Sequence, residues 1–290
     1  QIKANKSNIL LSYFSLKYKL TRKAFVKNAI KEKDLFTIQA KEIQLVNTNW
    51  GEQNDVFFFE SSNIKFDVLN ANIYRNKLPV DDISKKKLYS QMLRELPFNL
   101  RVDTLQISNS HVVYEEEKDF NFGAGKLSFY DFNLIATHIT GGKNFASSEP
   151  VQIKIKNKFM NDAKMEVNWT FNVLDLSDRF AISGKILDLN TQEIESFTKP
   201  YSQLTVQGKF ESVYFDFSGN DKNANGNFIV NQRDLKLVIY QKKNPNKVSK
   251  LKSAIGNLLL DKNAQKDEMK EVAIAVERKQ DRSVFHFLWL

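Results

Sequence analysis

The stretch from Phe98 to Glu117 constrains the fold most, because its apolar and polar residues alternate with the period of an extended strand. Phe98, Leu100 and Val102 fall on one face of that strand, and Arg101 falls on the other. The alternation resumes after one extra residue, with Leu105 and Ile107. An extra residue inside an alternating pattern indicates a bulge or a turn.

The second half of this stretch is predicted to return as a second strand. Ser108, Asn109 and Ser110 are residue types that favour turns. The alternation then restarts with Val112 and Tyr114. Two alternating segments joined by a short polar segment predict a β-hairpin.

The pattern of apolar residues in Phe98–Ile107, here called the repeated phrase, occurs earlier in the chain and again later. Its apolar residues recur at steps of two, two, three and two residues, and a Gln and an Asn recur with them in the first two copies. The first copy comprises Phe36, Ile38, Ala40, Ile43, Gln44, Leu45, Asn47 and Thr48, and the third comprises Val206, Gly208, Phe210, Val213 and Phe215. Any two half-buried strands share part of this pattern, but the recurring polar residues favour a sheet built by repetition.

Alternating segments fill most of the chain, which predicts a mainly β fold. Further strands are expected at 8–20, 56–60, 64–75, 127–136, 151–155, 165–173, 180–189, 203–217 and 228–241. One helix is predicted over residues 82–96, capped by Asp81 or Asp82 and ended by Pro97. A second helix is predicted over 246–260, where apolar residues form one stripe. Residues 22–33 are compatible with a strand or a helix, with Thr21 as a candidate cap.

No residue pattern in the chain points to catalysis, a cofactor or a metal. There is no Cys, and the three His residues, His111, His138 and His286, are too far apart in sequence to indicate a shared metal site. Nucleotide-binding and hydrolase motifs are missing from the sequence. The acidic run Glu115–Glu117 is interpreted as a solvated loop. We therefore predict a non-enzymatic protein.

The net charge of +9 is spread along the chain rather than concentrated in one segment. The 43 basic and 34 acidic residues are interleaved with the apolar strand positions, which favours a solvated sheet face. Neither an Arg-rich patch nor a known nucleic-acid-binding module is present. Nucleic acid is therefore not an expected partner.

Several residue combinations follow one another in a fixed order between about residue 60 and residue 290. They are Leu96-Pro97-Phe98 before the strand Leu100–Ile107, then Ser108-Asn109-Ser110 and Val113-Tyr114-Glu115-Glu116, Phe180, Ile182, Gly184 and Ile186 before Asp188-Leu189-Asn190, Lys199-Pro200 before Gly208 and Val213–Phe217, Gly226 before Asp234-Leu235-Lys236, Leu251, Ser253-Ala254-Ile255 and Asn257, and Ser283, Phe285 and Leu288-Trp289. In this order they resemble the AsmA-like proteins of Bacteroidetes envelopes, although Gly256 interrupts the helical stripe.

The resemblance implies an elongated, bent antiparallel sheet with an apolar concave face, similar to the grooves of TamB-like proteins. Residues 1–80 would form the N-terminal part of this groove, and residues 81–290 would form the AsmA-like C-terminal region, with its sheet at 98–241, in one continuous domain. Its implied partners are phospholipid or another acyl-chain lipid, bacterial membranes and envelope proteins. Phe98, Leu100, Val102, Leu105, Ile107, Val206, Phe210, Val213, Phe215 and Phe217 would line the groove.

The resemblance also implies a periplasmic location with an anchor in the inner membrane. The start at Gln1 and the apolar end at Trp289-Leu290 predict a longer protein, with a membrane helix upstream of this chain. The alternative function is that of a structural or assembly factor that binds outer-membrane protein partners through a sheet edge. A carbohydrate-binding β-protein is disfavoured, because the three Trp residues are scattered along the sequence.

Overall fold

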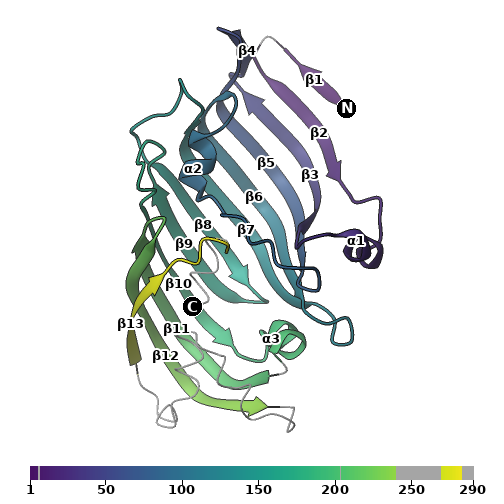
Figure 1. The fold of residues 1–290 in the computed structure, drawn as a ribbon, viewed down its shortest axis with the longest axis vertical. Coiled ribbons are helices and arrows are strands. Elements are labelled where there is room, and N and C mark those ends of the chain that lie inside the picture. The colour runs from purple at the N-terminus through teal and green to yellow at the C-terminus, as the bar shows by residue number, and fades with distance from the viewer. Residues whose placement is uncertain (6, 203, 240–268, 283–290) are drawn as a thin grey trace.

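The chain folds as one open, bent sheet of 13 strands, with three short helices in its described part (Figure 1). A computed structural model describes residues 1–5, 7–202, 204–239 and 269–282. The strands are β1 (Ile2–Ala4), β2 (Ile9–Leu16), β3 (Asp34–Val46), β4 (Asn49–Gln53), β5 (Val56–Asn76), β6 (Asn99–Glu117), β7 (Gly125–Gly141), β8 (Val151–Phe159), β9 (Ala163–Phe171), β10 (Phe180–Asn190), β11 (Leu204–Gly219), β12 (Asn223–Ile239) and β13 (Met269–Glu277). The helices are α1 (Arg22–Asn28), α2 (Tyr89–Arg94) and α3 (Glu195–Ser202).

Strands that follow one another in the sequence lie side by side, except that β4 pairs with β5 away from the main path. The mainly β fold and the bent, elongated sheet are confirmed, but the sheet is mixed rather than wholly antiparallel. β5 and β6 run parallel, with Phe59 opposite Leu100 and Ile73 opposite Tyr114. A parallel neighbour requires the chain to return to the same end of the sheet, and residues 77–98 make this crossover.

The predicted hairpin at 98–117 is wrong, because β6 continues through it as a single strand of 19 residues. Its pairing with β7 shifts register between Ile107 and Val112, and Asn109 has a φ of 49°. Asn tolerates this left-handed conformation, so the strand bulges there without turning back. The turn-favouring residues mark this bulge, while β5 and β7 on either side keep the strand extended.

The three-residue step of the repeated phrase coincides with an irregularity of the pairing in all three copies, but the register shifts there only in the third copy. In β3, Glu42 takes a φ of 52° between Ala40 and Ile43. In β6 the pairing with β7 omits Asp103, opposite His138, whose φ is 57°. In β11 the register shifts between Phe210 and Ser212. Glu42 and Asp103 drop out of the pairing without a register shift, whereas Glu211 is a bulge of one residue. In each copy apolar side chains stay on the same face on both sides of the irregularity.

The helices differ more from expectation than the strands do. Residues 22–28 form the helix α1. Thr21 caps it, because its side-chain hydroxyl accepts a hydrogen bond from the backbone amide of Ala24. The predicted helix 82–96 is reduced to α2, because Asp82 accepts the Ser84 amide in a local turn and Lys86 binds the same carboxylate. Pro97 follows its end. The predicted helix at 246–260 lies outside the described residues.

The third helix, α3, was not expected from the sequence, and Pro200 lies inside it. Its Phe197 packs on the larger of two clusters of buried apolar residues, which includes Phe159, Val213 and Phe228. Leu93 of α2 packs on the smaller cluster, around Val151, Phe171 and Val173. Both helices therefore lie against the same face of the bent sheet, as Figure 1 shows.

Candidate functional site

The face that carries α2 and α3 is apolar along nearly the whole sheet. Directly paired residues form an unbroken row, here called the first rung, that crosses eleven strands from β2 to β13. The first rung comprises Ile9, Leu45, Ile64, Leu105, Ala136, Ile153, Trp169, Ile182, Phe217, Gly226 and Ile274.

A second rung runs beside the first, two residues away along each strand. It comprises Leu11, Ile43, Phe66, Ile107, Leu134, Ile155, Val167, Gly184, Phe215, Phe228 and Val272. Neither rung contains a polar side chain. With strands about 4.8 Å apart, each rung is about 50 Å long.

The opposite face is polar at the residues that lie between the two rungs. This polar rung comprises Leu10, Gln44, Lys65, Gln106, Ile135, Lys154, Asn168, Ser183, Asp216, Asn227 and Ala273. Eight of these eleven side chains are polar or charged. The contrast between adjacent residues identifies one face for water and one for apolar contacts.

Glycine appears once in each rung, and a phenylalanine ring fills the space above it. The ring of Phe215 occupies the place that a Cβ on Gly184 would take. The ring of Phe217 comes within 2.7 Å of the corresponding Cβ position of Gly226. Phe215 and Phe217 stack at 5.7 Å between centroids, so the apolar surface continues over both glycines.

The structure places all ten predicted groove residues on this apolar face, but at different depths. Phe98, Leu100, Leu105, Ile107, Phe215 and Phe217 are half-buried, and the last four belong to the two rungs. The other four, Val102, Val206, Phe210 and Val213, are buried in the core. Buried side chains have no free surface for a ligand, so those four hold the sheet together.

Sequence reasoning missed most rung residues on the neighbouring strands. Phe66, Ile155 and Trp169 are half-buried members of the rungs, on β5, β8 and β9. Their strands were predicted by alternation, but alternation alone does not show which residues of different strands meet. The matching apolar steps of two on each strand were the available signal.

The apolar face is covered unevenly. α3 contacts β6, β7 and β11, while α2 contacts β7 and places Tyr89 edge-on to Trp169 at 5.0 Å. The crossover before α2 is tied to the far edge of the sheet, since the Lys86 amide donates to the Gln280 carbonyl at 2.7 Å. Ile64, Phe66 and Ile107, on β5 and β6, remain half-buried.

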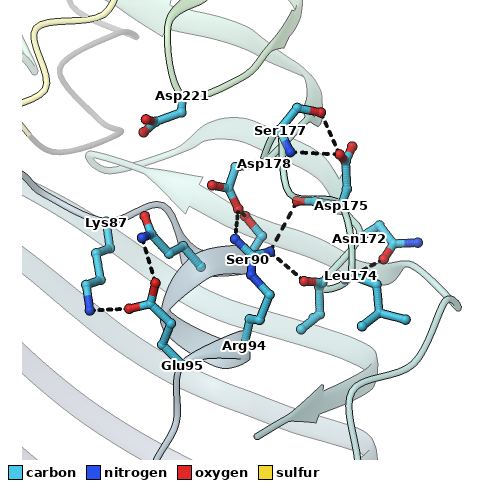
Figure 2. Close-up of polar contacts among 12 residues, drawn as sticks. Lys87, Ser90, Arg94, Glu95, Asn172, Leu174, Asp175, Ser177, Asp178 and Asp221 are labelled. Carbon is cyan, nitrogen blue, oxygen red and sulfur yellow. Dashed lines mark hydrogen bonds and ion pairs between the residues drawn. The ribbon is translucent and has the colours of Figure 1, made fainter. Parts of the chain in front are cut away.

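Polar contacts fix α2 to the turn between β9 and β10, as Figure 2 shows. Arg94 binds the Asp178 carboxylate at 2.8 Å and donates to the carbonyls of Val173 at 2.6 Å and Asp175 at 3.1 Å. Ser90 donates to the same carboxylate at 2.8 Å. The Asp178 side chain is only 6% exposed, so this contact is well shielded from water. It holds the helix over the apolar face.

The acidic run at the end of β6 is not a solvated loop, which corrects the interpretation from sequence. Glu116 and Glu117 are buried and accept hydrogen bonds from Tyr114 and Tyr74, respectively. Burial, and then the hydrogen bond to Glu117, raise the pKa of Tyr74 to about 12, so this tyrosine stays a donor. Glu115 binds Arg22 of α1 at 2.7 Å. The run therefore links the end of β6 to β5 and to α1 through side-chain contacts.

Two polar groups on the apolar face have no hydrogen-bond partner within the described residues. They are the side-chain amide of Asn157, which is 8% exposed, and the indole Nε1 of Trp169. Asn157 lies opposite Met165 among apolar neighbours. Buried polar groups are normally paired, so these enclosed atoms are exceptions within the apolar face.

A shallow depression of about 430 Å³ is present on sheet strands β8–β11. Asn168, Ser183 and Asp216 of the polar rung line it, and Asp216 is the one charged residue in its lining. A catalytic pocket needs several converging titratable groups, which this lining does not supply. Within the described residues, no group of three or more His, Cys, Asp or Glu could hold a metal ion.

The helices of the described part are all too short or too polar to cross a membrane. Comparison of the chain with protein-family models, with curated proteins and with solved structures gives no match.

Proposed function

We propose that this protein is a non-enzymatic lipid-binding protein whose apolar face holds the acyl chains of phospholipids. The observation that carries the proposal is the pair of uninterrupted apolar rungs, which α2 and α3 cover only in part. Apolar surface of this extent usually marks a binding site. Each methylene group of an acyl chain buried there would contribute about 0.8 kcal/mol.

The dimensions of the rungs fit extended chains. The hydrocarbon core of a bilayer is about 30 Å thick and contains two leaflets, so one acyl chain spans roughly half of that. A rung of about 50 Å can therefore accommodate more than one chain end to end. A long apolar path of this kind suits the movement of lipids as well as their storage.

The resemblance to AsmA-like proteins suggests the setting for this activity. We propose that the protein works in the bacterial periplasm, anchored to the inner membrane, and conducts phospholipid between the inner and outer membranes. Two separate observations support this proposal. The resemblance depends on the order of residues in the sequence, and the apolar face depends on the pairing of the strands.

A second candidate function is that of an assembly factor that pairs with an outer-membrane β-protein. It is favoured by the edge of the sheet, because β1 pairs only with Ile9–Leu11 of β2. The rest of β2, including the exposed Tyr13, Phe14 and Leu16, has no strand beside its outer edge in the part of the chain that the structure describes. Such an edge can accept another strand.

Native mass spectrometry of the gently purified chain tests the proposed function. We expect a series of added masses that match phospholipids, and we expect a delipidated sample to regain them from phospholipid vesicles. A chain that carries no lipid and takes none up would contradict lipid binding. Co-purification of an outer-membrane protein in place of lipid would favour the assembly factor.

A further inference from the structure

The chain segment around α1 presents an unusually basic surface. Residues 17–33 contain seven Lys or Arg residues and one acidic residue, Glu32, which pairs with Lys77 at 2.7 Å. Lys17, Lys19, Lys23 and Lys27 are exposed and form no ion pair with any described residue. Their charges are therefore free to meet an anionic partner.

The inner side of the same segment is firmly attached to the sheet. Arg22 binds Glu115 at 2.7 Å and lies over the ring of Tyr74, 4.2 Å from its centroid. Phe25 packs edge-on against Tyr18 at 5.6 Å. These contacts fix which way α1 faces, so its lysines are presented by an ordered element.

Two large aliphatic side chains lie exposed on either side of α1. Leu20, just before the helix, is 50% exposed, and Ile30, just after it, is 87% exposed. Exposed aliphatic residues next to lysines are the combination that binds membrane surfaces, because the lysines meet anionic headgroups while the aliphatic groups enter the interface. Nucleic-acid surfaces use the charges but give the aliphatic groups no role.

We propose that the α1 surface, defined as Lys17, Lys19, Leu20, Lys23, Lys27 and Ile30, docks on an anionic membrane. α1 connects β2 and β3 at the N-terminal edge of the sheet (Figure 1). Both rungs begin on β2, at Ile9 and Leu11. Docking would bring this edge to the membrane, and the entry of lipid chains there rests on the proposed function.

Co-sedimentation with vesicles tests the docking directly. The wild-type chain is expected to bind phosphatidylcholine vesicles that contain phosphatidylglycerol, and to bind pure phosphatidylcholine vesicles weakly. The triple variant Lys19→Glu, Lys23→Glu, Lys27→Glu is expected to bind at least about tenfold more weakly to the anionic vesicles. Leu20→Ser with Ile30→Ser is expected to weaken binding roughly fivefold without any change of charge.

A matched control reverses the same number of charges elsewhere. Lys65, Lys154 and Lys164 are exposed on the opposite face of the sheet, and their triple Glu variant is expected to keep anionic-vesicle binding within about threefold of wild type. Equal losses in both triple variants would overturn the proposal, because net charge alone would then explain the binding. It would also be overturned if the Ser variants bind normally and a DNA duplex competes with the vesicles.

Docking and lipid binding can fail separately. Docking is scored by sedimentation, and lipid uptake by mass spectrometry of the protein recovered from the vesicles. A chain that sediments through its α1 surface but acquires no lipid supports the docking site and contradicts the proposed function. A chain that acquires lipid from detergent micelles but does not sediment with anionic vesicles contradicts the docking site alone.

Discussion

Replacing Ile107 by glutamate is expected to leave the chain folded while removing most of the lipid that it binds. Ile107 lies in the second rung, opposite Phe66 and Leu134, and is half-buried. A carboxylate there can reach water in the ligand-free groove, but bound acyl chains would desolvate it, which costs several kcal/mol. We expect at least about a tenfold fall in bound phospholipid by mass spectrometry, with an unchanged circular dichroism spectrum.

Gln106→Glu supplies the matched control. Gln106 is the neighbouring residue of the same strand, half-buried as well, but it belongs to the polar rung on the opposite face. This variant should fold and keep its lipid. A third variant, Val213→Glu, puts the charge at a residue that is 6% exposed and should unfold the protein. If Ile107→Glu also unfolds, the face is a closed core, and if it keeps its lipid, the lipid lies elsewhere.

Truncating Arg94 to alanine is expected to produce the largest loss of stability among single changes at the helices. The change leaves the buried Asp178 carboxylate without its cation and removes donors from the carbonyls of Val173 and Asp175. Breaking a buried ion pair in this way costs about 3–5 kcal/mol of the free energy of unfolding. Urea denaturation measures this loss. Release of α2 should also shift the fluorescence of Trp169, which Tyr89 now contacts.

Lys87→Ala is the control for Arg94→Ala. Lys87 binds Glu95 on the outer side of the same segment, where both side chains are more than 40% exposed. Exposed ion pairs contribute little to stability, so the free energy of unfolding of this variant should be close to that of the wild type. Equal effects of the two substitutions would show that the contact with the β9–β10 turn does not hold α2 in place.

The strands could be predicted from the sequence because alternation is a local property. Phe36 to Leu45 and Phe98 to Ile107 show their period of two without reference to any other part of the chain. The continuation of β6 through Ser108–Ser110 could not be predicted, since β5 and β7 hold that segment extended. The parallel pairing of β5 with β6 could not be predicted either, because it requires residues 77–98 to carry the chain back to the end of the sheet where β5 begins.

The helices show how tertiary contacts override local signals. Asp81 and Asp82 look like helix caps, yet Asp82 forms a local turn with Ser84, and Lys85 binds Asp221 at 2.6 Å on a distant turn. α3 has weak helical propensity because of Pro200, and Phe197 attaches it to the core. The contact of Lys85 with Asp221 and the packing of Phe197 on the core both involve distant parts of the chain, so neither can be recognised from the local sequence.

The face of the candidate site was predictable, but its depth was not. The step of three between Val102 and Leu105, and between Phe210 and Val213, preserved the face across an irregularity of the pairing, which shifts the register only in the second case. Whether a side chain on that face is buried depends on what lies above it, and on which strands flank it. Leu105 is half-buried, whereas Val213 is buried between Ile186 and Val230.

Photolabelling with a phospholipid that carries a diazirine in its acyl chain tests most directly whether the apolar rungs hold lipid. After irradiation and digestion, we predict labels on rung residues that α2 and α3 leave half-buried, such as Phe66, Leu105, Ile107 and Ile155. The adjacent polar rung residues Lys65, Gln106 and Lys154 should remain unlabelled. Labels concentrated on the polar rung, or none on the sheet, would contradict lipid binding by this face.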